Sequence, residues 1–104
     1  MVKPSIAAIQ AAVCLEFGIS PGEMASDRRG QRVARPRQVA MYLAKRLTLL
    51  SFPNIGRGFA NRDHTTVMHA VARVTLLMDQ DELFALRVTA LEARLTAPEL
   101  VEHY

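Results

Sequence analysis

A chain of 104 residues is long enough for one domain with a modest core, and too short for a core plus a separate catalytic domain. Half of the residues are apolar, but only 6% are aromatic and none is tryptophan. This composition suits closely packed helices better than strands. The net charge is +3, the single cysteine excludes an internal disulfide, and no membrane-spanning run or signal peptide is recognisable, so we expect a cytoplasmic protein.

The first third of the chain predicts two helices and then a loop. Ser5 can cap a helix over about 5–17, and Gly18 follows as its terminator. The apolar positions of this helix recur at helical spacing: Ile6, Ile9, Val13 and Phe17. The motif "SPGE" at 20–23 is a capping box and predicts a second, short helix. The polar stretch 26–34 is typical of an exposed loop.

The middle of the chain predicts a long helix and then two helices joined by a tight turn. The long helix is expected to start at Pro36. Its apolar face consists of Val39, Leu43, Leu47 and Leu50. Ser51 caps a short helix over about 53–59, and a further helix begins near Asp63. The apolar positions of that helix are Val67, Ala70, Val71, Val74 and Met78. Such a pair forms a helix-turn-helix over about 53–79.

The C-terminal part predicts a last helix over about 82–96 and a tail over 97–104. The apolar positions of this helix are Leu83, Leu86, Ala90, Leu91 and Leu95. No linker or internal repeat divides the chain, so we expect residues 1–104 to form a single domain. The predicted fold class is therefore all-α, a compact bundle of about six helices that contains the helix-turn-helix.

Charge is distributed unevenly along the chain. Nine arginines and lysines, and no aspartate or glutamate, lie between Arg28 and Arg62. From Asp79 onward the balance reverses, because acidic residues outnumber basic ones. A basic middle segment favours nucleic acid as a partner over a merely solvated basic face, with acidic membrane surfaces well behind.

The stretch "DHTT" at the start of the second helix of the helix-turn-helix carries the chemistry that reads DNA. Helices of this kind contact base edges with their N-terminal residues. Asp63 can accept from a cytosine amino group, His64 can donate to or accept from a base edge, and Thr65 offers a hydroxyl and a methyl. Thr66 can add a hydroxyl to a phosphate near the helix N-terminus. The alternative is that Asp63 only caps the helix and the threonines only occupy its first turn.

Neither a metal site nor an enzyme is predicted. His64 and His69 are five residues apart, which does not place them one above the other on a helix, and no cofactor motif is present. Ser51, His64 and Asp63 are the only triad-like set. The side chains of adjacent residues diverge at a helix start, and Ser51 lacks the Gly-x-Ser-x-Gly surroundings of a nucleophile, so we expect no catalysis.

The run "VARPRQVAMYLAKRLTLLSFPNIGRGFANRDHTTVMHAVARV" at 33–74 resembles the C-terminal DNA-binding domain of the bacterial replication initiator DnaA. The resemblance extends from about residue 5 to about residue 95. It implies a Trp-repressor-like, all-helical domain that binds an asymmetric nine-base-pair element of duplex DNA, the DnaA box. A monomer on the DNA, associated with the nucleoid, is the default that the family implies.

The resemblance also implies which residues touch DNA. Arg29 in the loop matches the minor-groove arginine. Asp63, His64 and Thr65 match the residues that read bases in the major groove, and Pro53 matches a contact to a thymine methyl group. The positions that match phosphate contacts are Arg37, Gln38, Lys45, Thr48, Thr66 and His69. From its place in the pattern, His69 is expected to be a partly buried helix residue rather than a base reader.

Two departures from the family pattern stand out. No Gly-x-x-x-x-Gly-Lys-Ser/Thr loop is present, so the ATPase module of the initiator is missing and this chain cannot hydrolyse ATP. The chain has "ANRDH" where "GGRDH" is common, and Gly58 where a larger residue often sits, which are expected to shift the turn and the tilt of the reading helix.

Several functional roles remain open at this level. The chain is either the detached domain of an initiator or a small stand-alone relative, which Met1 and the unusual tail favour. A stand-alone protein would regulate transcription or compete for DnaA boxes. The last helix, with Leu83, Leu86 and Leu91, could instead dock a regulatory protein, although a plain core helix is the favoured interpretation.

Overall fold

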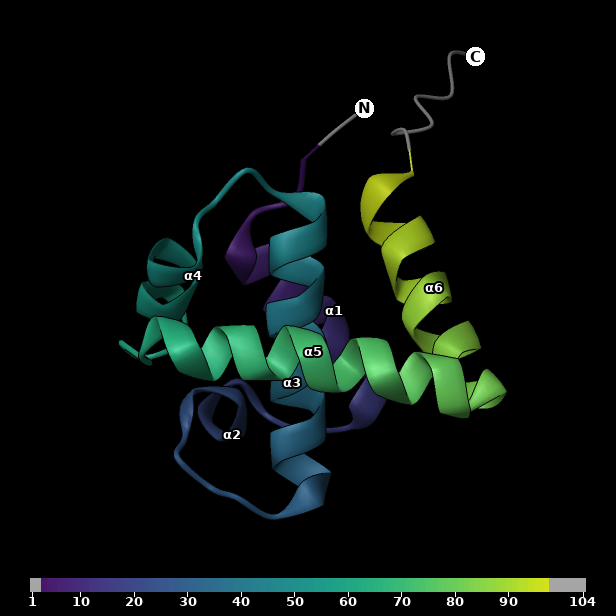
Figure 1. Cartoon of the computed structure of the whole chain (residues 1–104), viewed down its shortest axis with the longest axis horizontal. Coiled ribbons are helices and arrows are strands. Elements are labelled where there is room, and N and C mark those ends of the chain that lie inside the picture. Colours follow the sequence, from purple (N-terminus) through teal and green to yellow (C-terminus); the bar gives the residue numbers. More distant parts are fainter. Residues whose placement is uncertain (1–2, 98–104) are drawn as a thin grey trace, which may run out of the picture.

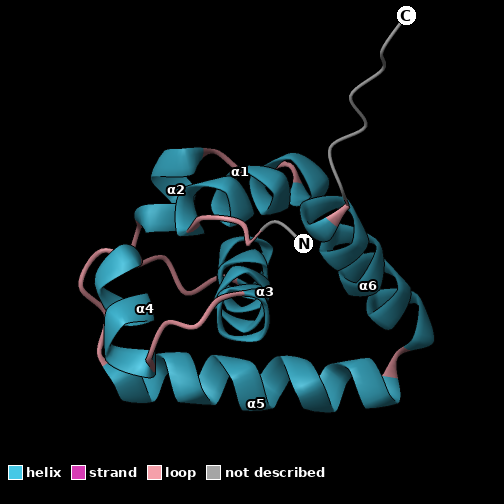
Figure 2. Cartoon of the chain, turned by 90° about the horizontal axis from the view of Figure 1, so that it is seen from above, coloured by secondary structure: helices cyan, strands magenta, loops and turns pink. Residues whose placement is uncertain are grey.

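The computed structural model describes residues 3–97, and every regular element in this range is a helix. The helices are α1 (Ile6–Phe17), α2 (Pro21–Ala25), α3 (Gln31–Leu47), α4 (Phe52–Gly58), α5 (His64–Gln80) and α6 (Glu82–Thr96). α3 runs through the middle of the molecule, and α5 crosses it on one side (Figure 1; Figure 2). The predicted all-α fold class is confirmed. None of these helices has both the length and the apolar character that crossing a bilayer requires, as far as residues 3–97 are concerned.

The first two helices begin and end at the predicted capping residues. The Ser5 hydroxyl accepts a hydrogen bond from the Ala8 amide at 3.1 Å, and Gly18 closes α1 with a left-handed φ of 68°. Ser20 and Glu23 form a capping box, in which each side chain accepts from the other residue's amide, at 3.0 and 3.1 Å. These bonds satisfy amides that a helix terminus leaves without partners.

α3 begins at Gln31, so the prediction that it starts at Pro36 is wrong. Pro36 lies inside the helix, where a proline removes one backbone hydrogen bond and costs about 3 kcal/mol. Val33 is only 3% exposed, and its burial offsets this cost by roughly 1.5–3 kcal/mol. The prediction of an exposed loop over 26–34 is therefore wrong in its second half, and the connection between α2 and α3 ends at Gly30.

The core lies where α3 packs against α1 on one side and α5 on the other. Fully buried side chains at these contacts are Ile9 and Val13 from α1, Val39 and Leu43 from α3, and Val67 and Val74 from α5. They belong to the apolar faces predicted for these three helices. Burial of one such aliphatic side chain contributes about 1.5–3 kcal/mol, so these contacts hold α5 firmly against α3.

The turn between α4 and α5 depends on a close backbone approach at Gly56. The Gly56 carbonyl accepts from the Arg62 amide at 2.9 Å, and a Cβ on Gly56 would collide with the Arg62 carbonyl oxygen. Ala60 and Asn61 have left-handed backbone conformations, with φ of 59° and 56°. The sequence "AN" thus reverses the chain in a conformation that glycine adopts more readily. This turn joins the two helices of the predicted helix-turn-helix.

Gly58 is small because α1 lies directly against the end of α4. A Cβ at Gly58 would lie 2.7 Å from Ile6 Cδ1. The Gln10 side-chain amide also donates to the Gly58 carbonyl at 3.0 Å. Glycine at this position therefore leaves room for Ile6 of α1.

α6 buries a different face from the predicted one. Val88 and Leu91 are fully buried, whereas Leu83 and Leu86 are 75% and 59% exposed. Ala90 is exposed as well. α6 packs only along α1, α3 and the end of α5, so a narrow stripe of its surface is covered. The predicted face is right at Leu91 and wrong at Leu83, Leu86 and Ala90, and the predicted tail lies, from residue 98 on, outside the described residues.

Candidate nucleic-acid interface

The first turn of α5 presents polar side chains to solvent. Asp63 is the N-cap: its carboxylate accepts from the Thr65 amide at 3.3 Å and from the Thr65 hydroxyl. His64 Nδ1 lies 3.3 Å from Asp63 Oδ1, and the two side chains are 51% and 63% exposed. Thr65 and Thr66 are exposed too. Asp63 therefore caps α5 and still keeps an open side toward a ligand.

Local hydrogen bonds favour the ionised form of Asp63. The Thr65 hydroxyl and amide lower the pKa of this carboxyl, with a smaller contribution from His64. An ionised carboxylate can only accept hydrogen bonds. The turn thus combines an acceptor, an imidazole, two hydroxyls and the positive end of the helix dipole. Within residues 3–97, no group of three or more potential metal ligands lies close together.

Pro53 and Arg29 lie on two other elements near this turn. Pro53 is exposed in the first turn of α4, just after the N-cap Ser51, whose hydroxyl accepts from the Asn54 amide at 3.3 Å. Arg29 lies in the loop over 26–30 between α2 and α3, is exposed, and makes no hydrogen bond or ion pair within the described part of the chain. Both side chains are accessible to a ligand.

A hollow of about 340 Å³ separates α3 from the first half of α5. Gln38, Thr66 and His69 line it, together with the guanidinium groups of Arg37 and Arg62. His69 is exposed, so the expectation that it is partly buried is wrong. Four residues predicted to hold phosphates, from two separate parts of the sequence, therefore meet at one place, beside Arg62 and the predicted base reader Thr65.

Arg37 is only 6% exposed, and its guanidinium holds the end of α2 and the loop that follows. Nε donates to the Met24 carbonyl at 3.1 Å and Nη1 to the Arg28 carbonyl at 3.0 Å. Nη2 lies 3.2 Å from the Glu23 carbonyl and 3.3 Å from the Ser26 hydroxyl. The sequence did not indicate this structural role, in which all three guanidinium nitrogens are already hydrogen-bonded although Arg37 also lines the hollow.

Two arginines of α3 are affected by the charge of a second arginine, one on α5 and one in the turn before it. Burial, and then the charge of Arg73, lowers the pKa of Arg35, while burial, and then the charge of Arg62, lowers the pKa of Arg37. None of the four arginines forms an ion pair within the described residues. Like charges held in this way favour the binding of an anion. Sequence reasoning missed Arg35, Arg62 and Arg73 as candidates because their proximity arises only when α3 and α5 pack together.

Lys45 and Thr48 lie at the other end of α3, where the chain enters α4. Lys45 Nζ is 3.5 Å from the Leu50 carbonyl and 4.5 Å from the centre of the Phe52 ring. Thr48 ends α3, and its hydroxyl donates to the Ala44 carbonyl at 2.6 Å. These two predicted phosphate contacts therefore form a second group, apart from the hollow.

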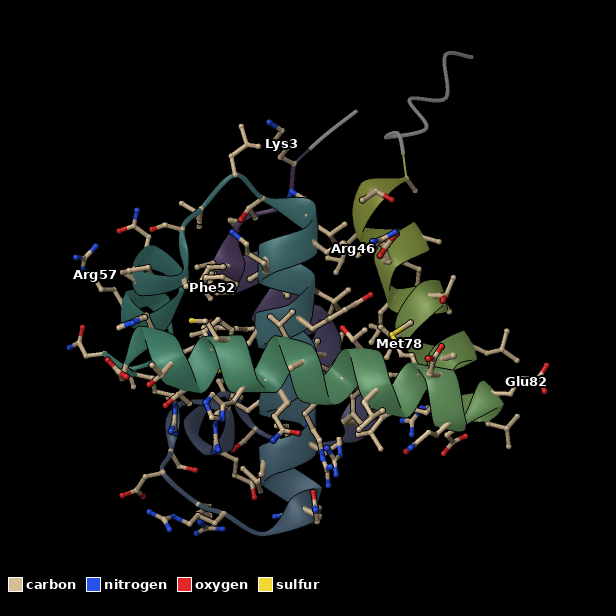
Figure 3. The ribbon with its side chains drawn as sticks, in the orientation of Figure 1. Lys3, Arg46, Phe52, Arg57, Met78 and Glu82 are labelled. Carbon is tan, nitrogen blue, oxygen red and sulfur yellow. The ribbon has the colours of Figure 1, made fainter. Side chains whose placement is uncertain are left out.

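Carboxylates pair with some arginines of the molecule and not with others, among them Arg28 and Arg32, which both pair with Glu23 beside the loop over 26–30. Arg57 on α4 and Glu82 at the start of α6 lie at opposite ends (Figure 3). Away from the helix-turn-helix, arginines are neutralised by the ion pairs Arg46–Glu92, Arg87–Glu16 and Arg94–Glu16, at 2.5, 3.2 and 3.3 Å. Most cations without a carboxylate partner in residues 3–97 therefore surround α4, α5 and the loop over 26–30.

Residues 6–74 match the family described as the bacterial DnaA protein helix-turn-helix. The chromosomal replication initiator protein DnaA of Gluconobacter oxydans is 61% identical over 83 residues, which cover 80% of this chain and 17% of that protein. The corresponding proteins of a Bradyrhizobium strain and of Rhodopseudomonas palustris are 49% and 45% identical, over 84% and 91% of this chain. The chain spans 17% to 21% of the length of these relatives. It belongs to the family of DNA-binding helix-turn-helix domains found in bacterial DnaA.

Proposed function

We propose that this domain binds duplex DNA sequence-specifically at a DnaA-box-like element. The observation that carries the proposal is the exposed turn at the start of α5, beside a hollow lined by Arg37 and Arg62, neither of which pairs with a carboxylate of residues 3–97. In a helix-turn-helix, the second helix enters the major groove with its N-terminal residues while the first crosses the backbone. In this chain α4 precedes α5, and the exposed polar turn lies at the N-terminus of α5.

In this proposal, the bases are read by Asp63, His64 and Thr65. The ionised carboxylate accepts from a cytosine amino group, and Thr65 contacts a thymine methyl with its own methyl group. The exposed ring of Pro53, at the start of α4, packs on a second thymine methyl. Each good base contact contributes about 1–3 kcal/mol of discrimination against a wrong base pair.

Phosphates are bound at the two groups of polar residues on α3 and α5. Gln38, Thr66 and His69 hold one phosphate in the hollow, with the charges of the surrounding arginines. Lys45 and Thr48 hold another at the entry to α4. We assign Arg37 mainly to support of the loop, with an electrostatic contribution to the hollow.

The loop over 26–30 places Arg29 in the neighbouring minor groove. A long, exposed arginine suits a narrow groove, where the negative potential is strongest. The reading helix and the loop arginine contact the DNA with different chemical groups, and one chain supplies each of them once. This arrangement matches an asymmetric DNA site, so a monomer is sufficient for recognition. Association with the nucleoid follows from this DNA binding.

The similar proteins are chromosomal replication initiator proteins. We propose that the domain serves origin recognition through its DNA box. Bound to such a box on their own, these 104 residues would occupy the element without an ATP-binding loop, and so would compete with an initiator for it.

The test is fluorescence anisotropy of the 104-residue chain on a labelled duplex with a consensus DnaA box and on a scrambled duplex. We expect the box to be preferred by about a hundredfold or more, because several base contacts of about 1–3 kcal/mol each act together. Equal affinity for the two duplexes at near-physiological salt would refute sequence-specific recognition.

Three variants assign the roles. His64→Ala is expected to reduce the preference for the box, whereas Lys45→Ala should weaken binding to both duplexes alike and lower the salt dependence by roughly one phosphate contact. Arg94→Ala is the matched control, since it removes the same charge beside Glu16, far from the helix-turn-helix. An equal loss on both duplexes in the His64 variant would remove His64 from the base-reading set.

A further inference from the structure

The loop that carries Arg29 is tied to the helix-turn-helix through Ser26. The Ser26 carbonyl accepts a hydrogen bond from Arg62 Nη2, and the Ser26 hydroxyl accepts from Arg37 Nη2 at 3.3 Å. The Ser26 hydroxyl also donates to the Glu23 carbonyl at 2.8 Å. The start of the loop is therefore held at one residue from two different elements, α3 and the turn before α5.

Arg62 is the residue through which the turn reaches the loop. Its backbone amide donates to the Gly56 carbonyl at 2.9 Å, which fixes the turn, and its next neighbour Asp63 caps α5. Its side chain donates a hydrogen bond to the carbonyl of Ser26, which lies 36 residues earlier in the chain. One residue thus positions the start of the reading helix with its backbone and the minor-groove loop with its side chain.

Holding Arg62 in this place is unfavourable by itself. Its Nε is buried and has no hydrogen-bond partner among the described residues. The charge of Arg62 also lies near enough to Arg37 to lower the pKa of Arg37. A buried donor without a partner and a like-charged neighbour both cost free energy. Against these costs, the Arg62 guanidinium makes one specific interaction, the hydrogen bond to the Ser26 carbonyl.

We propose that Arg62 is a positioning residue that sets the register between minor-groove and major-groove recognition. The inference rests on the proposed function, because it concerns how Arg29 and the first turn of α5 contact one DNA site. Successive base pairs are about 3.4 Å apart, so a loop displaced by a few ångströms brings Arg29 to the wrong step. Arg62 fixes this spacing without touching a base.

The first test is a double-mutant cycle in DNA binding. Arg62→Lys keeps the positive charge, and therefore the attraction to phosphates, but loses the planar fork that reaches Ser26. We expect Arg62→Lys to weaken binding to the box at least fivefold in the wild-type background and less than twofold in the Arg29→Ala background. Arg46→Lys is the matched control, because the Arg46 side chain pairs with Glu92 of α6 and makes no contact with the loop over 26–30, and it should change neither affinity.

Equal losses in the two backgrounds would overturn the proposal, since a general loss of stability acts regardless of Arg29. Thermal unfolding of each variant shows whether it is folded at the assay temperature. If lysine unfolds the turn, Arg62→Met takes its place in the cycle. Because methionine also removes a charge from the hollow, both backgrounds are then expected to lose affinity, and the proposal requires the loss to be larger in the wild-type background than in Arg29→Ala.

The second test needs no DNA. Backbone order parameters from ¹⁵N relaxation are expected to fall for residues 26–30 in Arg62→Lys and to stay unchanged in Arg46→Lys. Unchanged order in the Arg62 variant would overturn the tie between turn and loop. If the wild-type chain does not distinguish the box from a scrambled duplex, the proposed function is refuted, and with it the role of Arg62 in the spacing between Arg29 and α5. A loss of loop order in Arg62→Lys would even then establish that Arg62 holds the loop over 26–30.

Discussion

Replacing Ala60 by glycine is expected to stabilise the protein. Ala60 has a φ of 59°, in the left-handed region, within the turn between α4 and α5. An L-amino acid in this region brings its Cβ too close to the following carbonyl oxygen, at a cost of about 1–2 kcal/mol. Glycine has no Cβ and adopts this conformation without the cost.

Two opposing effects set the size of the gain. Glycine is more flexible in the unfolded chain, which reduces the benefit by roughly 0.5–1 kcal/mol. The methyl group of Ala60 is exposed, so its removal sacrifices little apolar burial. The net stabilisation therefore lies between about 0 and 1.5 kcal/mol and is centred on about 0.75 kcal/mol, which for a domain of this size corresponds to a rise in Tm of about 3–6 °C.

Thermal unfolding followed by circular dichroism, together with urea titration, measures this change. Ala93→Gly is the matched control, because Ala93 is exposed inside α6, where glycine costs about 1 kcal/mol. We expect the two substitutions to shift Tm in opposite directions. A lower Tm for both would refute the argument that the turn strains Ala60.

Three further predictions concern folding. Gly56→Ala should lower the free energy of unfolding by about 1–3 kcal/mol in urea titrations, since its Cβ would collide with the Arg62 carbonyl oxygen; an unchanged midpoint would contradict that close approach. Asp63 has a lowered pKa when folded, so its charge stabilises the protein above its unfolded-state pKa of about 3.9, and this contribution is lost as the pH falls through the lower folded-state value. The advantage of the wild type over Asp63→Asn in urea titrations should therefore begin to decline at about pH 4 and disappear below the lowered folded-state pKa, and an advantage that does not decline with falling pH would have another origin. Leu91→Ala should cost about 2–5 kcal/mol and Leu83→Ala less than about 0.5 kcal/mol, because only Leu91 is buried; equal costs would mean that α6 packs on the other face.

Capping and periodicity were predictable because they are local. The Ser5 cap, the Ser20–Glu23 capping box and the Asp63 cap each involve residues at most three positions apart, and all three form. The first turn of α5 could therefore be identified as an exposed polar turn before its surroundings were known. Helical spacing also identified the buried faces of α1, α3 and α5, except at Leu50: α3 ends at Leu47, because the chain turns at Thr48 toward α4, so the prediction that Leu50 belongs to this helix is wrong.

Two errors arose where local signals competed with packing. Pro36 is a strong signal for a helix start, yet burial of Val33 extends α3 toward its N-terminus. In α6, two overlapping sets of apolar residues satisfy helical spacing, one with Leu83 and one with Val88. The sequence alone favoured the set with Leu83. Only the position of α1 and α5 decides that Val88 is covered and Leu83 is not.

By itself, the sequence determined the helical fold class, the helix-turn-helix and the polar first turn of α5, because neighbouring residues along the chain create these features. The tertiary structure alone decided that Arg37 is buried, that Arg35 lies near Arg73, and that Arg62 reaches Ser26. Each of these depends on how α2, α3 and α5 pack, and no spacing within one helix encodes the distance between side chains on different helices.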